Sequence, residues 1–426
     1  NMFHDVLVPF AERRIIIMIE ISKKKYMKDI LKYAYNEIPY YKDVLKGIDM
    51  DSDVDKVYEE IPIQCKNNMR DNENYINQRM KGMDIELVTK ITGGTTGEPW
   101  NITKTFLEST RYFNMLWKSR IQFGIKPNDH FYQFGGYGEI DGVFTTKQVI
   151  ETSRFTEFSM FHLNDRVLDE YIDIIKEGKG NWFFAIFSAL YILAHRMRDR
   201  KIKGLGNIKY VELTGERVYE YQEALIAEVF NCPVSIMYGS REITCISHRC
   251  KYGKHHILPK VFVDVIDDDG KSIVSQEGKL GEIVVTSFID KYMPFIKYRT
   301  GDYGTVDTTD DCPCGCRGVY FKKLEGRKAA YVTVGNIKVH LEITYYLMEK
   351  FNRIYGEGIR QFQVIFKKPN IFHFKFVLDS ANYQKTVKDF YVQELKAVVE
   401  QANVEIEFVK YIERVKRKLN PYIIEE

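Results

Sequence analysis

Cysteine and histidine residues gather in two short stretches whose spacing suits a metal site. Three of the seven cysteines fall within DDCPCGCRG, residues 310–318, and CKYGKHH, residues 250–256, offers Cys250 together with His255 or His256. Four-coordinate zinc is bound by thiolates and imidazoles, usually as two close pairs. The two stretches therefore predict a structural zinc site, to which each would contribute one pair of ligands.

Cys312 and Cys314 are the expected second pair, with Gly315 permitting a tight turn, and Cys316 could replace either of them. A catalytic thiol would need a lowered pKa and a positioned base, and the sequence indicates neither. A disulfide across one intervening residue would be strained. Surface cysteines without metal stay an alternative, because Cys-x-Cys is a short pattern that also occurs by chance.

A second group of candidate residues lies in polar loops that contain glycine. TGGTTGEP (92–99) could turn backbone N–H groups and threonine hydroxyls toward an anion, although it lacks the Lys-Ser/Thr pair of a Walker A loop. TGE (214–216), YGSREIT (238–244) and YRTGD (298–302) each follow, or lie close after, a strand-like run. Ligands bind outside the carboxyl ends of strands in open α/β sheets. The four loops could therefore converge on one nucleotide, whereas TGGTTGEP taken alone could equally be a flexible turn.

Three acidic residues in these loops suit such a site. Glu216 and Glu242 offer the oxygen ligands that Mg²⁺ prefers. Asp302 could accept hydrogen bonds from ribose hydroxyls, as acidic residues do in dinucleotide-binding folds. For each acid taken singly, a solvated surface carboxylate is the more frequent case.

Alternating strand-like and helical segments must position these loops. The strand-like runs cover residues 85–92, 207–213, 233–237, 260–267, 281–288 and 318–324. Helical patterns cover residues 10–46, 105–123, 165–177, 182–200 and 217–230. Alternation of this kind predicts an α/β core.

The pattern changes after about residue 327. A strand, a helix, two strands, a helix and a strand follow, which predicts a compact β-α-β-β-α-β unit of about 100 residues. We therefore expect a large N-terminal multi-sheet α/β domain over residues 1–326. A small α+β C-terminal domain, residues 327–426, should be joined to it by a hinge in LEGRKAA (324–330).

Composition argues against several classes of protein. The length of 426 residues fits two or three domains of about 100–200 residues, and a net charge of +3 gives no electrostatic case for binding nucleic acid. The longest apolar run, WFFAIFSALYILA (182–194), is shorter than the ~20 residues that span a bilayer and is expected to be a buried helix. An odd number of cysteines and the lack of an export signal at the start predict a cytoplasmic protein.

The ordered set TGGTTGEP, TGE, YGSREIT, YRTGD and LEGRKAAYVTVGNIKVH resembles the adenylate-forming ligases, and within them the phenylacetate–CoA ligase group and its capsule-biosynthesis relatives. The resemblance runs from IPYYK near residue 38 to the C-terminal tail. It implies an acid–thiol ligase that converts a small-molecule carboxylic acid and ATP to an acyl-adenylate and pyrophosphate, then transfers the acyl group to coenzyme A. An acyl carrier protein or an amine as acceptor is an alternative, as is a zinc-stabilised homologue that binds ligand without catalysis.

The resemblance also implies roles for single residues. The phosphates of ATP would be bound by Thr92, Gly93, Gly94, Thr95, Thr96 and Gly97. The adenine and acyl pocket would be lined by Glu216, Tyr238, Gly239 and Ser240, and the substrate would lie beside Gly215 and the Gly136 and Tyr137 of FGGYG. Glu242 would hold Mg²⁺, Asp302 would bind the ribose hydroxyls, and Arg327 would lie at the domain junction near the ribose.

Two segments depart from the family pattern, and a third refines the zinc site. A catalytic lysine of the small domain is expected at Lys418, with Lys416 as second candidate, in IERVKRKLNPY, which lacks the family's glycine. The hinge position that is commonly charged is Ala329 here, which leaves the alternation between half-reactions and the acceptor open. The family's Gly-x-His pattern favours His255 over His256 as the zinc ligand, beside Cys250, Cys312 and Cys314.

Overall fold

The computed structural model describes most of the chain. The described residues are 8–77, 85–91, 100–135, 139–140, 143–144, 148–160, 163–274, 278–309, 311–327, 331–341, 343–356, 358–412 and 422–425. Within them, no helix is both long enough and apolar enough to cross a membrane.

A twelve-stranded mixed sheet forms the centre of the large N-terminal part. Its parallel region consists of β10 Val234–Tyr238, β9 Tyr210–Thr214, β8 Trp182–Ile186, β3 Phe131–Gly135 and β7 Phe155–Ser159, with β6 Val149–Glu151 antiparallel at the edge. Its antiparallel region consists of β13 Val261–Ile266, β14 Gly281–Ser287, β15 Tyr298–Thr309, β16 Gly318–Arg327, β12 His255–Ile257 and β11 Ser247–Arg249. The sheet confirms the α/β class predicted from the alternating segments.

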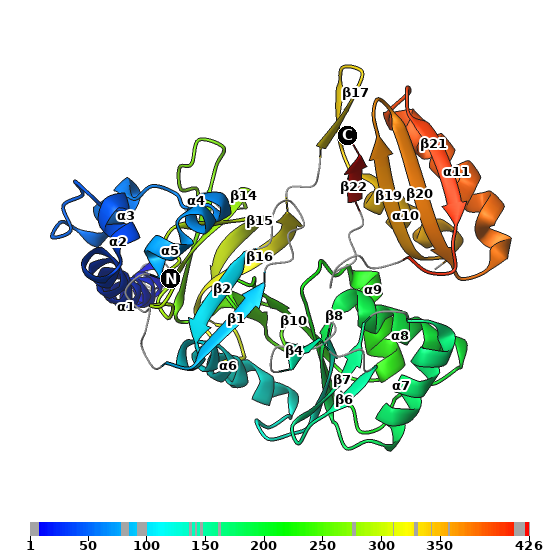
Figure 1. Cartoon of the computed structure of the whole chain (residues 1–426), viewed down its shortest axis with the longest axis horizontal. Coiled ribbons are helices and arrows are strands. Elements are labelled where there is room, and N and C mark those ends of the chain that lie inside the picture. The colour runs from blue at the N-terminus through cyan, green and yellow to red at the C-terminus, as the bar shows by residue number, and fades with distance from the viewer. Residues whose placement is uncertain are drawn as a thin grey trace, which may run out of the picture.

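Helices cover the parallel region and pack apolar side chains against it. These helices are α7 Asp165–Glu177, α8 Phe187–Asp199 and α9 Glu220–Phe230, which Figure 1 shows together beside β6, β7 and β8. Asn164 starts α7 by accepting a hydrogen bond from the backbone N–H of Val167, at 3.1 Å. The side chains that α7 buries recur at helical spacing: Val167, Leu168, Tyr171, Ile172 and Ile175.

The N-terminal helices and two short hairpins complete the large N-terminal part. These helices are α1 Val8–Glu37, α2 Pro39–Val44, α3 Val54–Glu60, α4 Lys66–Asp71, α5 Glu73–Ile76 and α6 Phe106–Arg120, followed by the 3₁₀ turn η2 Ile121–Phe123. The hairpins are β1 Leu87–Ile91 with β2 Asn101–Thr105, and β4 Glu139–Ile140 with β5 Val143–Phe144. A capping box between Thr105 and Glu108 fixes the point where α6 begins.

Two predictions of local structure are wrong. Residues 182–200 do not form one helix, because 182–186 is strand β8 and α8 begins only at Phe187. Trp182 and Phe183 are both buried, so both faces of this strand are covered and its sequence shows no alternation that would distinguish it from a buried helix. YRTGD is not a loop after a strand but the first five residues of β15.

The C-terminal part forms a separate sheet with its own hydrophobic core (Figure 1). Its elements are β17 Tyr331–Val334, β18 Ile337–His340, α10 Ile343–Tyr355, β19 Ile359–Lys367, β20 Ile371–Leu378, η3 Ala381–Tyr383, α11 Gln384–Val398, β21 Asn403–Phe408 and β22 Tyr422–Glu425. The strand order is β21-β20-β19-β22. The β-α-β-β-α-β order is confirmed, with the first β realised as a hairpin and with β22 as an added strand. The domain boundary at 326/327 stays a prediction.

Candidate active site

The TGE stretch lies at the carboxyl end of β9, where the sheet meets the start of α8. Gly215 has φ 86°, a left-handed conformation that glycine adopts without strain. The carboxylate of Glu216 accepts hydrogen bonds from the backbone N–H of Ser188 at 2.8 Å and from its hydroxyl at 2.9 Å. Because Ser188 lies in the first turn of α8, Glu216 is held at the positive end of a helix.

YGSREIT makes a tight turn after β10. A side chain at Gly239 would collide with the carbonyl oxygen of Thr244, so only glycine fits there. The hydroxyl of Ser240 accepts a hydrogen bond from the backbone N–H of Ile243 at 3.0 Å, which closes the turn. This hydroxyl therefore has a structural partner in addition to any ligand it contacts.

Two tyrosine–carboxylate hydrogen bonds join YGSREIT to YRTGD. The hydroxyl of Tyr238 donates to Asp302 at 2.9 Å, and the hydroxyl of Tyr298 donates to Glu242 at 3.0 Å. Each stretch thus supplies one tyrosine and one acid. In the sheet order β16, β12 and β11 separate β15 from β10, so the sheet must curve strongly to bring these side chains together. The structure therefore gathers two of the predicted site segments at one place.

The segment leading to the predicted junction meets the same place. Asp302 and Arg327 are cross-strand neighbours in the antiparallel pairing of β15 with β16. Arg217, which follows TGE directly, forms an ion pair with Glu325 at 2.7 Å and also donates to the carbonyl oxygen of Glu325 at 3.3 Å. Sequence reasoning missed Arg217, although its place directly after Glu216 was a signal.

Several predicted site residues lie outside the described residues. They are the phosphate-loop residues Thr92, Gly93, Gly94, Thr95, Thr96 and Gly97, the substrate residues Gly136 and Tyr137, the hinge residue Ala329 and the tail lysines Lys416 and Lys418. The predicted phosphate loop lies in the chain between β1 and β2, whose ends pair Ile91 with Asn101. In β2 a buried ion pair between Lys104 and Asp290 ties this hairpin to the segment after β14, and Tyr112 donates to Asp290 at 2.6 Å.

Three cysteines and one histidine come together from the segment after β11, from β12 and from the segment before β16. Ligand atoms of Cys250, His256, Cys312 and Cys314 all lie within 4.8 Å of one another. Nε2 of His256 is 3.3 Å from the sulfur of Cys312 and 3.2 Å from that of Cys314. The sulfurs of Cys250 and Cys312 are 3.8 Å apart. A tetrahedral zinc ion about 2.3 Å from each sulfur places the sulfurs ~3.8 Å apart. The Cys250–Cys312 distance matches this value and the Cys312–Cys314 distance is 3.3 Å, so three thiols and an imidazole gather as a zinc site needs.

The histidine in this group is His256, which corrects the preference for His255. On β12 consecutive side chains point to opposite faces, and only His256 faces the cysteines. Burial lowers the pKa of His256 to about 4 and raises the pKa of Cys314 to about 11. A histidine that stays neutral is in the form that binds metal. Cys316 lies outside the group and contributes a backbone N–H, 3.4 Å from the sulfur of Cys314.

A buried charge network underlies the TGE strand. Arg120 donates from Nε to Glu212 at 2.9 Å, and Nε2 of His248 lies 2.9 Å from the same carboxylate. Burial alone would raise the pKa of Glu212, but Arg120 and His248 hold it well below its ordinary range. Glu212 lies on β9, two residues before Thr214, so its carboxylate fixes the strand that presents TGE. Sequence reasoning missed this network.

Comparisons with known proteins agree with this arrangement. No family model matches the chain. A phenylacetate–coenzyme A ligase of Thermus thermophilus is 23% identical over 333 residues, which cover 75% of this chain and 72% of the relative. A crystal structure of 2-hydroxyisobutyryl-CoA ligase, in the postadenylation state in complex with R3-HIB-AMP, matches with a TM-score of 0.70 at 15% identity and covers 94% of this chain and 88% of that one.

The same ligase was also solved in another state. Its structure with 2-HIB-AMP and CoA, in the thioesterification state, matches with a TM-score of 0.56 at 16% identity and covers 98% of this chain and 91% of that one. Sequence relatives and fold together confirm the predicted resemblance to the adenylate-forming superfamily and, within it, to the phenylacetate–CoA ligase-like group.

Proposed function

We propose that the protein is an AMP-forming acid–thiol ligase. It would activate a carboxylic acid with ATP, release pyrophosphate, and transfer the acyl group from the acyl-adenylate to coenzyme A. The observation that carries the proposal is the pair of hydrogen bonds Tyr238–Asp302 and Tyr298–Glu242, which bring together the two segments expected to hold the nucleotide. The relatives that bear this activity support it.

The residues divide the work of adenylate formation between them. Asp302, oriented by Tyr238, accepts hydrogen bonds from the ribose, and Glu242, oriented by Tyr298, offers an oxygen ligand to Mg²⁺. When bound, Mg²⁺ neutralises charge on the phosphates, so that two anions can approach each other. Backbone donors of the loop 92–97 and the tail lysine Lys418 would add stabilisation of the developing charge.

We infer that the zinc ion is structural and braces this site. Cys250 follows β11 and the pair Cys312/Cys314 precedes β16, so the ion would tie the segment after YGSREIT to the segment after YRTGD. All four ligand positions are protein atoms, which leaves no open coordination site for a substrate. The cysteines must stay reduced to bind metal, which supports a cytoplasmic location.

Replacing Cys312 with serine should remove the zinc and lower the melting temperature by about 5 °C or more, because metal binding contributes directly to folding. Cys312 is buried and its sulfur contacts Cys250, His256 and Cys314. Elemental analysis of the full-length protein should find about one zinc per chain in wild type. Cys316→Ser is the matched control and should keep both metal and melting temperature. A wild type that holds no metal would contradict the assignment.

The proposed function is tested by product analysis. Incubation with ATP, Mg²⁺ and a panel of aryl and aliphatic acids, followed by coenzyme A, should give AMP and a thioester of one of the acids. Formation of ADP instead of AMP would contradict the adenylate mechanism. An acyl-adenylate that accumulates without forming a thioester would keep the first step but reject coenzyme A as the acceptor.

A further inference from the structure

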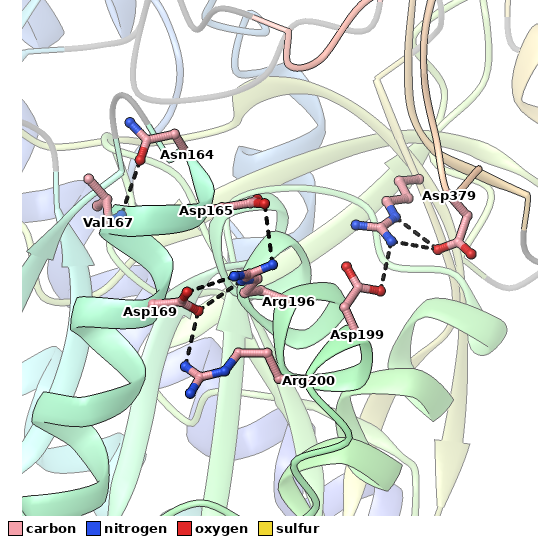
Figure 2. A network of polar contacts seen from close by, with 9 residues as sticks. Asn164, Asp165, Val167, Asp169, Arg196, Asp199, Arg200 and Asp379 are labelled. Atoms are coloured by element: carbon pink, nitrogen blue, oxygen red, sulfur yellow. Dashed lines mark hydrogen bonds and ion pairs between the residues drawn. The ribbon is translucent and has the colours of Figure 1, made fainter. Parts of the chain in front are cut away.

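Four charged residues connect helix α8 to the C-terminal sheet. Arg360 of β19 forms an ion pair with Asp199, the last residue of α8, at 2.7 Å. Arg198 of the same helix forms an ion pair with Asp379, directly after β20, at 3.0 Å. Each part therefore supplies one arginine and one aspartate, and the pairs cross between the parts. We call these four residues the α8 latch (Figure 2 labels its two aspartates, Asp199 and Asp379).

The latch is a connected network rather than two isolated pairs. Arg360 also binds Asp379 within the C-terminal sheet, through Nε at 2.9 Å and Nη2 at 2.7 Å, so its guanidinium bridges both aspartates. Its side chain is 22% exposed and that of Asp199 is 31% exposed. Networks of this kind stabilise an arrangement more than single surface pairs do, yet they remain accessible to solvent and salt.

The end of helix α8 that carries Arg198 and Asp199 is held against α7 by ion pairs. Arg196 binds Asp169 of α7 at 2.6 Å and Arg200 binds the same aspartate at 3.0 Å, as Figure 2 shows. Nη2 of Arg198 lies 2.9 Å from Nδ1 of His195, which is buried. Burial and the neighbouring arginines hold the pKa of His195 well below its ordinary value, so the imidazole is neutral and can accept from Arg198.

The latch lies at the end of the C-terminal sheet where β19 begins. β22, the strand that follows Lys418, runs parallel to β19 and pairs Tyr422 with Val364. β22 therefore runs in the same direction as β19, away from the end of β19 that carries Arg360.

We propose that the α8 latch positions the C-terminal sheet for adenylate formation and must open for acyl transfer, an inference that rests on the proposed function. Its four residues contact neither ATP nor acid; they are positioning residues. A polar, partly exposed contact can open, because polar interfaces between domains of one chain are typical of domains that move. Breaking the latch should therefore favour the opened arrangement and slow the first half-reaction without slowing the second.

Single-molecule energy transfer on the full chain measures the arrangement without any substrate. Labelled amino acids replace two exposed residues, Leu107 on α6 and Tyr346 on α10. Arg360→Ala and Asp199→Asn should each raise the ratio of opened to latched molecules about three- to tenfold, and so should raising the salt concentration. The double variant should add little to Arg360→Ala, because both changes break the same contact.

A matched control is available within the C-terminal part. Lys350 and Glu394 form an ion pair of similar exposure there, at 2.6 Å, and Lys350→Ala should leave the ratio unchanged. Unchanged ratios in both latch variants, with melting temperatures equal to wild type, would overturn the latch. If a variant is unstable, the wild-type protein provides the test. A wild-type ratio of opened to latched molecules that does not change with salt concentration would also overturn the latch.

Measuring adenylate formation and thioester formation separately tests the latch independently of the proposed function. Arg360→Ala should lower acid-dependent pyrophosphate exchange about three- to tenfold, whereas thioester formation from supplied acyl-adenylate should be equal to wild type or faster. Equal losses in both steps would indicate general damage and reject the latch. A wild type without exchange would sink the proposed function, while the energy-transfer result would still report on the contact.

Discussion

Asp302→Ala should lower the rate of acid-dependent ATP–pyrophosphate exchange by about a hundredfold or more, with little change in melting temperature. The carboxylate lies on β15, accepts a hydrogen bond from Tyr238 at 2.9 Å and neighbours Arg327 across the strand pair. A fixed acceptor that orients the ribose holds the α-phosphorus in line for attack, and the loss of such orientation costs about this much. Steady-state exchange at saturating acid, with ATP varied, measures the effect.

The matched control lies on the same strand. Asp307 of β15 contacts Lys322 at 3.4 Å on a partly exposed part of the sheet, and Asp307→Ala should leave exchange within about twofold of wild type. Tyr238→Phe removes only the hydroxyl that orients Asp302, so its loss should be intermediate, about tenfold. Asp302→Ala with wild-type exchange would show that the nucleotide binds elsewhere.

Glu212→Gln should cost about 3–5 kcal/mol of unfolding free energy, the second large effect that we expect. The change leaves the guanidinium of Arg120 buried without its counter-charge, and Arg120 is only 3% exposed. Arg120 also lies over the rings of Trp117 and Trp182, at 5.3 and 5.0 Å, so it cannot move to water without disrupting this packing. Urea unfolding followed by tryptophan fluorescence measures the loss.

Lowering the pH should reduce the difference in unfolding free energy between wild type and Glu212→Gln. The pKa of Glu212 is lowered in the folded protein from its ordinary value of 4.5, so its stabilisation is present above that value and is lost as the pH falls toward the folded value. Glu394→Gln, which breaks a partly exposed pair with Lys350, should cost less than about 1 kcal/mol and serves as control. A Glu212→Gln variant as stable as wild type would mean that the network contributes no net stability.

The sequence predicted those parts of the fold that depend on patterns within one short segment. The order of strands and helices around 207–238, and the C-terminal β-α-β-β-α-β unit, follow from short hydrophobic patterns and were confirmed. Strand β8 was missed because it is buried on both faces, and a run of apolar residues has no period to read. The full length of β15 was missed because Gly301 and the polar residues of YRTGD are typical of a turn.

In the candidate site, too, only the features determined by residues close together in the chain could be predicted. Motif spacing was enough to expect that YGSREIT and YRTGD converge, and the two tyrosine–carboxylate hydrogen bonds agree with it. The choice between His255 and His256 depended on which face of β12 points at the cysteines, and this register is set by pairing with β11 and β16. Arg120, Glu212 and the α8 latch join residues far apart in the chain, so no local pattern could reveal them.

Acid-dependent exchange of labelled pyrophosphate into ATP by the wild-type chain tests the central claim most directly. It reports formation of an acyl-adenylate and needs no assumption about the acceptor. We predict exchange that requires Mg²⁺ and at least one acid from a panel of aryl and aliphatic carboxylic acids. A zinc-loaded, folded protein that catalyses no exchange with any of these acids would contradict the account.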